Sequence, residues 1–493
     1  MLPQSGLSKA EIFKRLGEFA NLDANPYSGR LFTIAFEPGN EELREVAHRA
    51  FEMFMDKNIL DFTEFKSAMK MEKEVVDIAK RLMHADGEVV GTYTFGGTES
   101  VFLAVKAARD NFIIRKGFQM PEIVMPIHAH PCYEKAAEYM GLKVVRVPVN
   151  PETLEGDPDA INEAITENTA MIVASTPNWP FGTIDPVKEF AEIAEDKKVW
   201  LHVDACVGGF ILPFFEKLGE DIPEFDFRVE GISSMSLDPH KYAYSSIGSS
   251  IVLFKKPFYK MLAQYANLRW PGYPIVNPAV LSSRSAGPLA ATWAILHYLG
   301  EEGYTELARK ILSARRKIID GFSSLGFKLL GKPRSPIVAF TSEEVDLFTL
   351  TDVLMKKGWL VLPQISKKDF KIPRSIHLTI TPIHDMLADE FLRAVEEAKS
   401  EAKAPAEAEV VRGLGMITSL LSTGEDPEAL RLLMTRVEQY IELYGNELIK
   451  AFGLEKGLPD EMAMIYELFD AIPPEITELL VNYLVIELYR RGF

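Results

Sequence analysis

The sequence predicts an α/β fold: a mainly parallel, doubly wound sheet in a large domain, a small α+β domain and a helical C-terminal extension. Three observations support this prediction. The chain has 493 residues, enough for two or three domains. From about residue 98, short apolar strands alternate with helical stretches, the pattern of a parallel sheet. After about residue 310 this regular alternation ends.

The predicted elements follow one another without long gaps. Apolar runs with β-branched centres are typical of buried strands, and apolar residues at three- and four-residue spacing are typical of helices. We expect strands at 122–126, 143–149, 170–175, 199–204, 337–340 and 375–381. We expect helices at 98–109, 133–140, 186–195, 311–325 and 388–399. The domains are then an N-terminal arm at 1–85, a large domain at 86–310 and a small domain at 311–405.

The last part of the chain, 406–493, is predicted to be a helical extension. A short charged segment that contains Pro405 precedes it and is typical of a linker. Apolar residues then recur at helical spacing in 427–444 and 474–491. We expect these helices to add a packing or dimerisation element.

Composition excludes several classes of protein. With 47% apolar and 25% charged residues, the chain is globular rather than disordered. A net charge of −17 argues against a nucleic-acid partner. Cys132 and Cys206 cannot form a disulfide framework, and no run reaches the roughly 18 apolar residues of a membrane span. We expect a cytoplasmic protein with no metal site and no membrane association.

Two motifs at the ends of predicted strands supply an anion cradle and an acid. Gly97 and Thr98, in TFGGTES, open a helix whose free amides can hold an anion. Taken alone, such a glycine pair is more often an ordinary turn. Asp204 ends the strand at 199–204 among apolar neighbours, where a carboxylate is costly unless a cation faces it. The alternative is a carboxylate that caps a loop.

Two further motifs supply a lysine and a histidine. Lys241 lies between apolar segments, and a partly desolvated lysine can form a Schiff base, although most such lysines are surface residues. His130 follows the strand at 122–126, where a lone histidine is normally structural. With the cradle and the acid, these residues suit pyridoxal 5'-phosphate, which needs a phosphate site, a lysine, an aspartate at its pyridine nitrogen and a flat ring partner.

The segments GTYTFGGTESVFLAVKAARD, HVDACVGGF, FDFRVEGISSMSLDPHKYAY and SSRSAG resemble the sphingosine-phosphate lyase branch of the group II pyridoxal-phosphate decarboxylases. The resemblance covers about residues 27–444. It implies a fold-type I homodimer whose active sites are shared between subunits. It also implies that Lys241 binds the cofactor aldehyde, that Asp204 contacts the pyridine nitrogen and that His130 stacks on the ring. Gly97 and Thr98 would hold the cofactor phosphate.

The resemblance assigns roles to four more residues. His240 and Tyr242 flank the lysine, where they can contact the cofactor or move protons. The loop 283–287 matches the segment that a neighbouring subunit contributes to the site. In that loop, Gly287 is expected at the cofactor and Arg284 at the substrate.

Substrate positions depart from this branch, in which a tyrosine, a histidine and a lysine hold the substrate phosphate. Phe36, Asp61 and Ile247 stand at these three positions. Asp61 in place of the histidine and Ile247 in place of the lysine remove two positive charges and add a negative one, which should repel a phosphate. Arg374 stands where the lyases usually have a neutral residue, and it can grip a substrate carboxylate, with surface exposure as the alternative. Pro239 also replaces the lyase-like threonine, as in amino acid decarboxylases.

We therefore predict a carbon–carbon lyase that acts on a small-molecule amine or amino acid, in first place an amino acid decarboxylase. The alternative is an aldehyde-lyase that cleaves an unphosphorylated or unusual β-hydroxy amine in a retro-aldol reaction. A third hypothesis is an inactive scaffold that has kept its cofactor site, which the intact Lys241, Asp204 and His130 disfavour.

Overall fold

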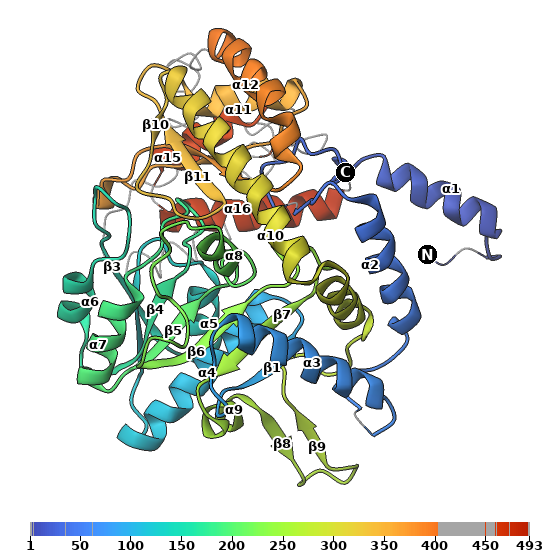
Figure 1. The fold of residues 1–493 in the computed structure, drawn as a ribbon, viewed down its shortest axis with the longest axis vertical. Helices are drawn as coiled ribbons and strands as arrows, with labels where there is room; N and C mark the ends of the chain where they lie inside the picture. The colour runs from blue at the N-terminus through green and yellow to red at the C-terminus, as the bar shows by residue number, and fades with distance from the viewer. Residues whose placement is uncertain are drawn as a thin grey trace.

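A seven-stranded sheet forms the centre of the large domain in this computed structural model (Figure 1). The structure describes residues 2 and 4–402, apart from 35 and 62, and then 449, 459 and 461–491, apart from 473. The strands of this sheet are β1 Val90–Thr94, β2 Glu122–Pro126, β3 Lys143–Val147, β4 Thr169–Ser175, β5 Trp200–Asp204, β6 Ile232–Leu237 and β7 Ser250–Phe254. Their order is β1-β7-β6-β5-β4-β2-β3. Strands β2 to β6 are parallel and β7 is antiparallel to β6 and β1, so the predicted α/β fold with a mainly parallel sheet is confirmed.

Helices cover both faces of this sheet. They are α4 Gly97–Lys116, α5 Cys132–Met140, α6 Pro158–Ala164, α7 Val187–Lys197, α8 Leu212–Lys217 and α9 Pro257–Ala263. Because successive side chains of a strand face opposite sides, Ile123 and Met125 pack beneath α4 and α5, whereas Val124 joins the core on the side of α7. This double burial explains why the strands are continuous apolar runs rather than alternating ones.

The small domain is built on a four-stranded antiparallel sheet of order β10-β11-β13-β12. Its strands are β10 Lys328–Leu329, β11 Ile337–Thr341, β12 Leu362–Gln364 and β13 Ser375–Thr379. Its helices are α10 Gly287–Ser324, α11 Leu347–Lys356, η1 Lys368–Phe370 and α12 His384–Glu401. Helix α10 is kinked at Gly300, where φ is 55°, and it runs through the boundary we predicted at residue 310. One long helix therefore belongs to both domains.

Three helices and a hairpin extend the large domain. The helices are α1 Lys9–Ala20, α2 Glu41–Phe54 and α3 Lys66–Leu82, and the hairpin strands are β8 Tyr265–Asn267 and β9 Ile275–Asn277. Helix α1 projects away from the body of the chain, and it buries none of its residues (Figure 1). The hairpin projects at another edge (Figure 1).

The C-terminal helices in the described part of the chain are α15 Ala463–Ala471 and α16 Pro474–Arg491. Helix α16 matches the helical pattern predicted for 474–491, whereas the pattern predicted for 427–444 lies outside the described residues. Both helices share a small apolar cluster that includes Ile465, Leu468, Leu484 and Leu488. Among the described helices, none is long and apolar enough to cross a membrane.

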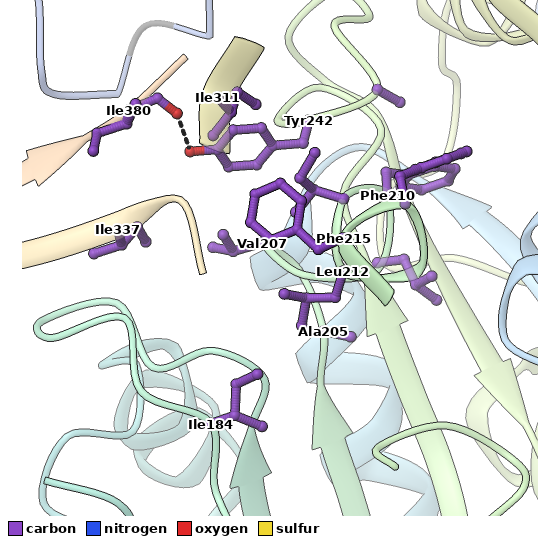
Figure 2. Close-up of a cluster of buried hydrophobic side chains, with 14 of the residues drawn as sticks. Ile184, Ala205, Val207, Phe210, Leu212, Phe215, Tyr242, Ile311, Ile337 and Ile380 are labelled. Carbon is purple, nitrogen blue, oxygen red and sulfur yellow. Dashed lines mark hydrogen bonds between the residues drawn. The ribbon is translucent and has the colours of Figure 1, made fainter. Parts of the chain in front are cut away.

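An apolar cluster joins the two domains just beyond β5 (Figure 2). Val207 and Phe210 come from the segment that follows β5, while Ile337 and Ile380 come from the small domain. Because these side chains are almost completely buried, the small domain is held against the carboxyl edge of the large sheet. This is the edge at which parallel sheets bind ligands.

Candidate active site

Lys241 lies in the turn between β6 and β7, beside a buried acid. Its Nζ is 3.0 Å from Oδ2 of Asp238 and 5.8 Å from the ring centre of Trp179. Asp238 is only 1% exposed. Burial alone would lower the pKa of Lys241, but the negative charge of Asp238 raises it above its ordinary value. The lysine is therefore held as an ammonium, and it must leave Asp238 before its nitrogen can bond to an aldehyde.

Asp204 ends β5 with both carboxylate oxygens hydrogen-bonded by neutral donors. The Tyr133 hydroxyl donates to Oδ2 at 3.2 Å, and the Cys206 amide donates to Oδ1 at 3.1 Å. Burial, together with the charge of Asp204, keeps the pKa of Tyr133 well above its ordinary value, so this hydroxyl stays protonated. These donors orient the carboxylate without neutralising it.

His130 lies between β2 and α5 and belongs to the same electrostatic cluster. Its Nδ1 accepts a hydrogen bond from the Cys132 amide at 3.2 Å, which leaves Nε2 to carry the hydrogen of the neutral ring. Although the residue keeps an exposed surface, the surrounding protein atoms lower the pKa of its imidazole, and the charge of Asp204 opposes this only partly. His130 is therefore a neutral ring beside the acid.

The glycines at the start of α4, Gly96 and Gly97, bring the backbone to this cluster. Gly96 has φ 134°, a conformation that side chains rarely allow, and the space around it is open. A Cβ on Gly97 would lie 2.6 Å from Oδ2 of Asp238 and 3.1 Å from Sγ of Cys206. Because the first-turn amides of a helix lack helical partners, Gly97 and Thr98 present N–H groups that no acceptor among the described residues takes up. The predicted anion-binding segment at Gly97 and the side chain of Lys241 thus both lie against Asp238.

Tyr242 and His240 flank the lysine, and both are held by backbone groups. Tyr242 is fully buried, its hydroxyl donates to the Ile380 carbonyl at 2.9 Å (Figure 2), and its ring lies 5.1 Å from that of Phe36. This placement favours a structural role over the proton transfer that we expected for Tyr242. His240 Nδ1 lies 2.5 Å from the Ser249 carbonyl, and burial lowers the pKa of His240 despite the charge of Asp238.

Two predicted substrate positions lie apart from these contacts. Asp61 accepts hydrogen bonds from Thr63 and from the Glu64 amide, and the Thr63 hydroxyl chiefly holds the pKa of Asp61 below its ordinary value. Ile247 is 87% exposed. In the described part of the chain, no hydrogen bond or ion pair links either residue to Lys241. Their place at a substrate stays a prediction.

The loop 283–287 packs within its own chain. Arg284 is buried and donates from Nη1 to the Tyr93 carbonyl at 3.2 Å, while its backbone bonds to Asn58 and Ile59. Gly287 begins α10, and a Cβ there would lie 3.0 Å from the ring of Phe51. This tight packing fixes the loop, and the predicted contacts of Arg284 with substrate and of Gly287 with cofactor stay predictions.

Arg374 precedes β13 and is engaged by the C-terminal helix α15. Its Nη1 and Nη2 each lie 2.7 Å from an oxygen of Glu467, and its Nε lies 2.6 Å from Oδ2 of Asp470. These ion pairs occupy the guanidinium that we expected either at a substrate carboxylate or at the surface. Neither expectation anticipated a partner 93 residues further along the chain.

Three residues that contact this cluster were not identified from the sequence. Asp238 stands three residues before Lys241, in a turn that brings the two together, and this spacing was a readable signal. Tyr133 lies within the motif that contains His130. Trp179 stands between two prolines and stacks on the buried His377 of β13 at 4.8 Å, a contact that no local pattern reveals.

These residues fit pyridoxal phosphate. The open space at Gly96 and the free amides suit a phosphate, Lys241 is close by, and Asp204 offers a carboxylate oriented by neutral donors. The carboxylate of Asp238 borders the cradle, but the Lys241 ammonium lies 3.0 Å from it and offsets its charge. The donor set therefore provides each group that the cofactor requires.

Comparisons with known proteins show what this chain is similar to. A family model described as the pyridoxal-dependent decarboxylase conserved domain matches residues 51–343. Sphingosine-1-phosphate lyase from Dictyostelium discoideum is 36% identical over 381 residues, which cover 77% of this chain and 70% of that protein. A probable L-tyrosine/L-aspartate decarboxylase from Methanothermobacter thermautotrophicus is 31% identical over 357 residues, covering 71% of this chain and 95% of that protein.

A solved structure is similar to this chain over an even larger share of its length. Sphingosine-1-phosphate lyase from Burkholderia pseudomallei superimposes with a TM-score of 0.77 and 30% identity, covering 86% of this chain and 97% of that one. The family match at 51–343 includes Gly97, His130, Asp204 and Lys241. It ends before Arg374 and α15.

Proposed function

This chain belongs to the pyridoxal-dependent decarboxylase family, and from that premise we propose that it is an aldehyde-lyase. It is a lyase that uses pyridoxal 5'-phosphate, as the motifs predicted. Its proposed substrate is a β-hydroxy amine without phosphate, cleaved between the amine-bearing carbon and the carbinol carbon. The observation that carries the proposal is the similarity to sphingosine-1-phosphate lyases over most of the chain. The amino acid decarboxylation that we preferred from the sequence has less support than this alternative.

The side chains of the cluster have distinct tasks in this proposal. Bound pyridoxal phosphate supplies an electron sink for bond cleavage beside the substrate nitrogen. Lys241 holds the cofactor aldehyde, and the charge of Asp204 keeps the pyridine nitrogen protonated. His130 offers a flat, neutral ring for stacking. The amides of Gly97 and Thr98 bind the phosphate.

Cleavage also needs a base at the substrate hydroxyl. His240 is neutral at pH 7, because burial lowers its pKa. Its Nδ1 lies 2.5 Å from the Ser249 carbonyl, and a neutral ring that carries its hydrogen there leaves Nε2, 3.7 Å from Oδ2 of Asp238, able to accept a proton. Tyr242 cannot do this while its hydroxyl is bonded to Ile380. We therefore assign the base to His240.

The proposed substrate lacks a phosphate because the chain offers little to hold one. Asp61 carries a negative charge, and Ile247 offers only an apolar side chain. Phe36 contributes a ring packed on Tyr242, with no hydroxyl. A phosphate at these positions would meet repulsion instead of hydrogen bonds.

We also propose a homodimer in which subunits share their active sites. Ile247 is large, apolar and 87% exposed only a few residues from Lys241. Phe13, Leu16 and Phe19 of α1 are likewise exposed on one helix. Apolar surface of this kind is usual where another subunit binds. Sedimentation equilibrium should give twice the chain mass of 55.3 kDa, and a monomer would contradict the proposal.

Amino acid decarboxylation remains the second candidate. The similarity to a probable L-tyrosine/L-aspartate decarboxylase favours it. Arg374 also favours it, provided that its guanidinium is released from α15.

One experiment distinguishes the aldehyde-lyase from the amino acid decarboxylase. The cofactor-loaded protein is incubated with unphosphorylated 2-amino-1,3-diols and with the common amino acids, while aldehyde is trapped with a hydrazine and carbon dioxide is measured. Aldehyde from the diols supports the aldehyde-lyase, and carbon dioxide without aldehyde would replace it by the decarboxylase. If neither aldehyde nor carbon dioxide forms although the cofactor is bound, the protein is the inactive scaffold. Lys241→Ala is the control for background reaction.

A further inference from the structure

We propose that Asp238 is a positioning residue for Lys241: its carboxylate holds the lysine whenever the lysine is not bonded to the cofactor, and so favours the form in which a substrate amine has replaced it. The inference goes beyond the proposed function, because the replacement of the lysine by an amine begins the aldehyde-lyase and the decarboxylase reactions alike.

The backbone places this carboxylate beside the lysine. Asp238 is 1% exposed, and its Oδ2 lies 3.0 Å from Nζ of Lys241. The Lys241 amide donates to the Asp238 carbonyl at 3.1 Å, which closes a turn between the two residues. The Asp238 amide donates to the Cys206 carbonyl at 3.2 Å, which ties the turn to the segment after β5. The distance between acid and lysine is therefore fixed by the fold.

Asp238 is the acid that contacts this lysine. Burial alone would lower the pKa of Lys241, and the charge of Asp238 raises it above its ordinary value. His240 also faces the acid, with Nε2 at 3.7 Å from Oδ2, but burial lowers the pKa of its ring, which is neutral. The ring of Trp179 covers Nζ at 5.8 Å and favours a cation there. The remaining titratable groups that face the lysine or the acid are those of His130, Cys132, Asp204 and Cys206.

When Lys241 bonds to the cofactor, a buried carboxylate loses its cation. In the described part of the chain, no other lysine or arginine lies within ion-pair distance of Asp238. The backbone also packs against this acid, because a Cβ on Gly97 would lie 2.6 Å from Oδ2. Separating a buried ion pair is unfavourable, so the carboxylate attracts the lysine whenever its nitrogen is released.

Amine exchange releases the lysine in the charged form that Asp238 binds. The nitrogen of a substrate ammonium replaces Nζ in the double bond to the aldehyde carbon. The two protons that it gives up pass to Nζ, which already carries one, so Lys241 leaves as an ammonium and no proton is left over. Asp238 stabilises this ammonium and favours exchange. The same carboxylate should oppose attachment of the cofactor, because the ammonium must first lose a proton and leave the acid.

The first test is the rate at which pyridoxal 5'-phosphate, at saturating concentration, attaches to the cofactor-free full-length chain. Absorbance follows the reaction from about pH 7 to about pH 9.5. Asp238→Asn lowers the pKa of Lys241, and each unit raises the neutral fraction about tenfold, so we expect attachment at least about tenfold faster near pH 7.5. The ratio of variant to native rates should shrink as pH rises, because the lysine of the variant becomes neutral first.

The second test follows the opposite reaction. O-methylhydroxylamine takes the aldehyde carbon from Lys241 in the cofactor-loaded protein and releases the lysine as an ammonium, whatever the natural substrate is. We expect Asp238→Asn to react several-fold more slowly here, although it attaches the cofactor faster. A structural role alone would change both rates in the same direction. Turnover enters neither test, so failure of the aldehyde-lyase proposal would not affect them.

Glu122→Gln is the matched control. It removes another buried acid that lies 3.0 Å from a lysine, Lys143, at the start of β2, and it should leave both rates unchanged. A ratio of one, a ratio that is the same at every pH, or a change in the same direction in both reactions would overturn the inference. If Asp238→Asn does not fold, the native chain decides: an attachment rate that levels off below about pH 9, relative to Nα-acetyl-lysine, would overturn it, and a continued rise supports it.

Discussion

Asp204 and Arg374 are both charged residues beside predicted strands, and their surroundings differ in one decisive respect. Asp204 is held by a hydroxyl and an amide, which orient its carboxylate, and among the described residues it forms no ion pair. Arg374 is held by two carboxylates, which neutralise it. A charged side chain kept in place by neutral dipoles is still available to a charged ligand, whereas an ion-paired one is not. The region around Asp204 is thus prepared for a charged ligand, whereas Arg374 is committed to helix α15.

The most severe test of the prepared region is Lys241→Ala. Without this amine the cofactor cannot be attached, so its absorbance band should disappear and turnover should fall by more than about a thousandfold. Absorbance spectra and initial rates measure both effects. Lys255→Ala, which removes an ion pair with Asp86 on the same domain, serves as the control. A normal band in Lys241→Ala would show that another residue binds the cofactor.

Asp204→Asn should have the next largest effect. The amide keeps the shape of the side chain but loses the charge that stabilises the pyridine nitrogen, so we expect turnover to fall by about a hundredfold. Cofactor content, measured after denaturation, should stay near that of the native protein. Undiminished turnover would refute the assigned role of Asp204 and with it the contrast to Arg374.

Acid should destabilise the large and the small domain to a similar extent, because each domain contains a fully buried histidine. The pKa values of His202 and His377 are lowered by burial to about 4, against 6.5 in an unfolded chain. Between these values the unfolded chain binds protons that the folded chain does not, so stability is lost as pH falls from 6.5 towards 4. Each histidine should lower the free energy of unfolding by about 2 kcal/mol at pH 5 relative to pH 7.

Urea unfolding at several pH values measures this loss. His202→Asn or His377→Asn should each remove part of the pH dependence. His297→Gln, at an exposed position, should not. A profile that is the same in all three variants would show that buried histidines do not govern acid stability here.

Tyr133→Phe tests whether the neutral donors at Asp204 matter. Loss of one hydrogen bond should cost about 1 kcal/mol of stability and reduce turnover several-fold. It should also shift the pH dependence of the cofactor absorbance, since the basicity of Asp204 changes. The matched control is Tyr304→Phe, which removes an equally buried hydroxyl bonded to the Ala243 carbonyl. A spectral shift in both variants would indicate a general structural effect.

The same contrast explains which features could be predicted from the sequence. Gly97, His130, Asp204 and Lys241 follow strands of one parallel sheet, so local motifs and strand order suffice to bring them together. The environment of Arg374 depends on a helix about 90 residues away, which no local pattern connects to it.

Other discrepancies have similar physical causes. The antiparallel strand β7 pairs with β1, which precedes it by about 160 residues, and side-chain periodicity does not reveal strand direction. The role expected for Tyr242 ignored its hydrogen bond to Ile380 of the small domain, a contact that exists only after the domains pack.

The smallest expected effect is that of Asp352→Asn, which weakens the docking of α15 without touching Arg374. An amide accepts hydrogen bonds from the Met462 and Ala463 amides less strongly than a carboxylate, so the docked helix should lose about 1 kcal/mol. Faster amide exchange in 463–471 would report this loss. Asp157→Asn, which changes the equivalent cap of α6, should leave that exchange unchanged. Unchanged exchange in 463–471 would mean that Asp352 does not hold the start of α15 in place.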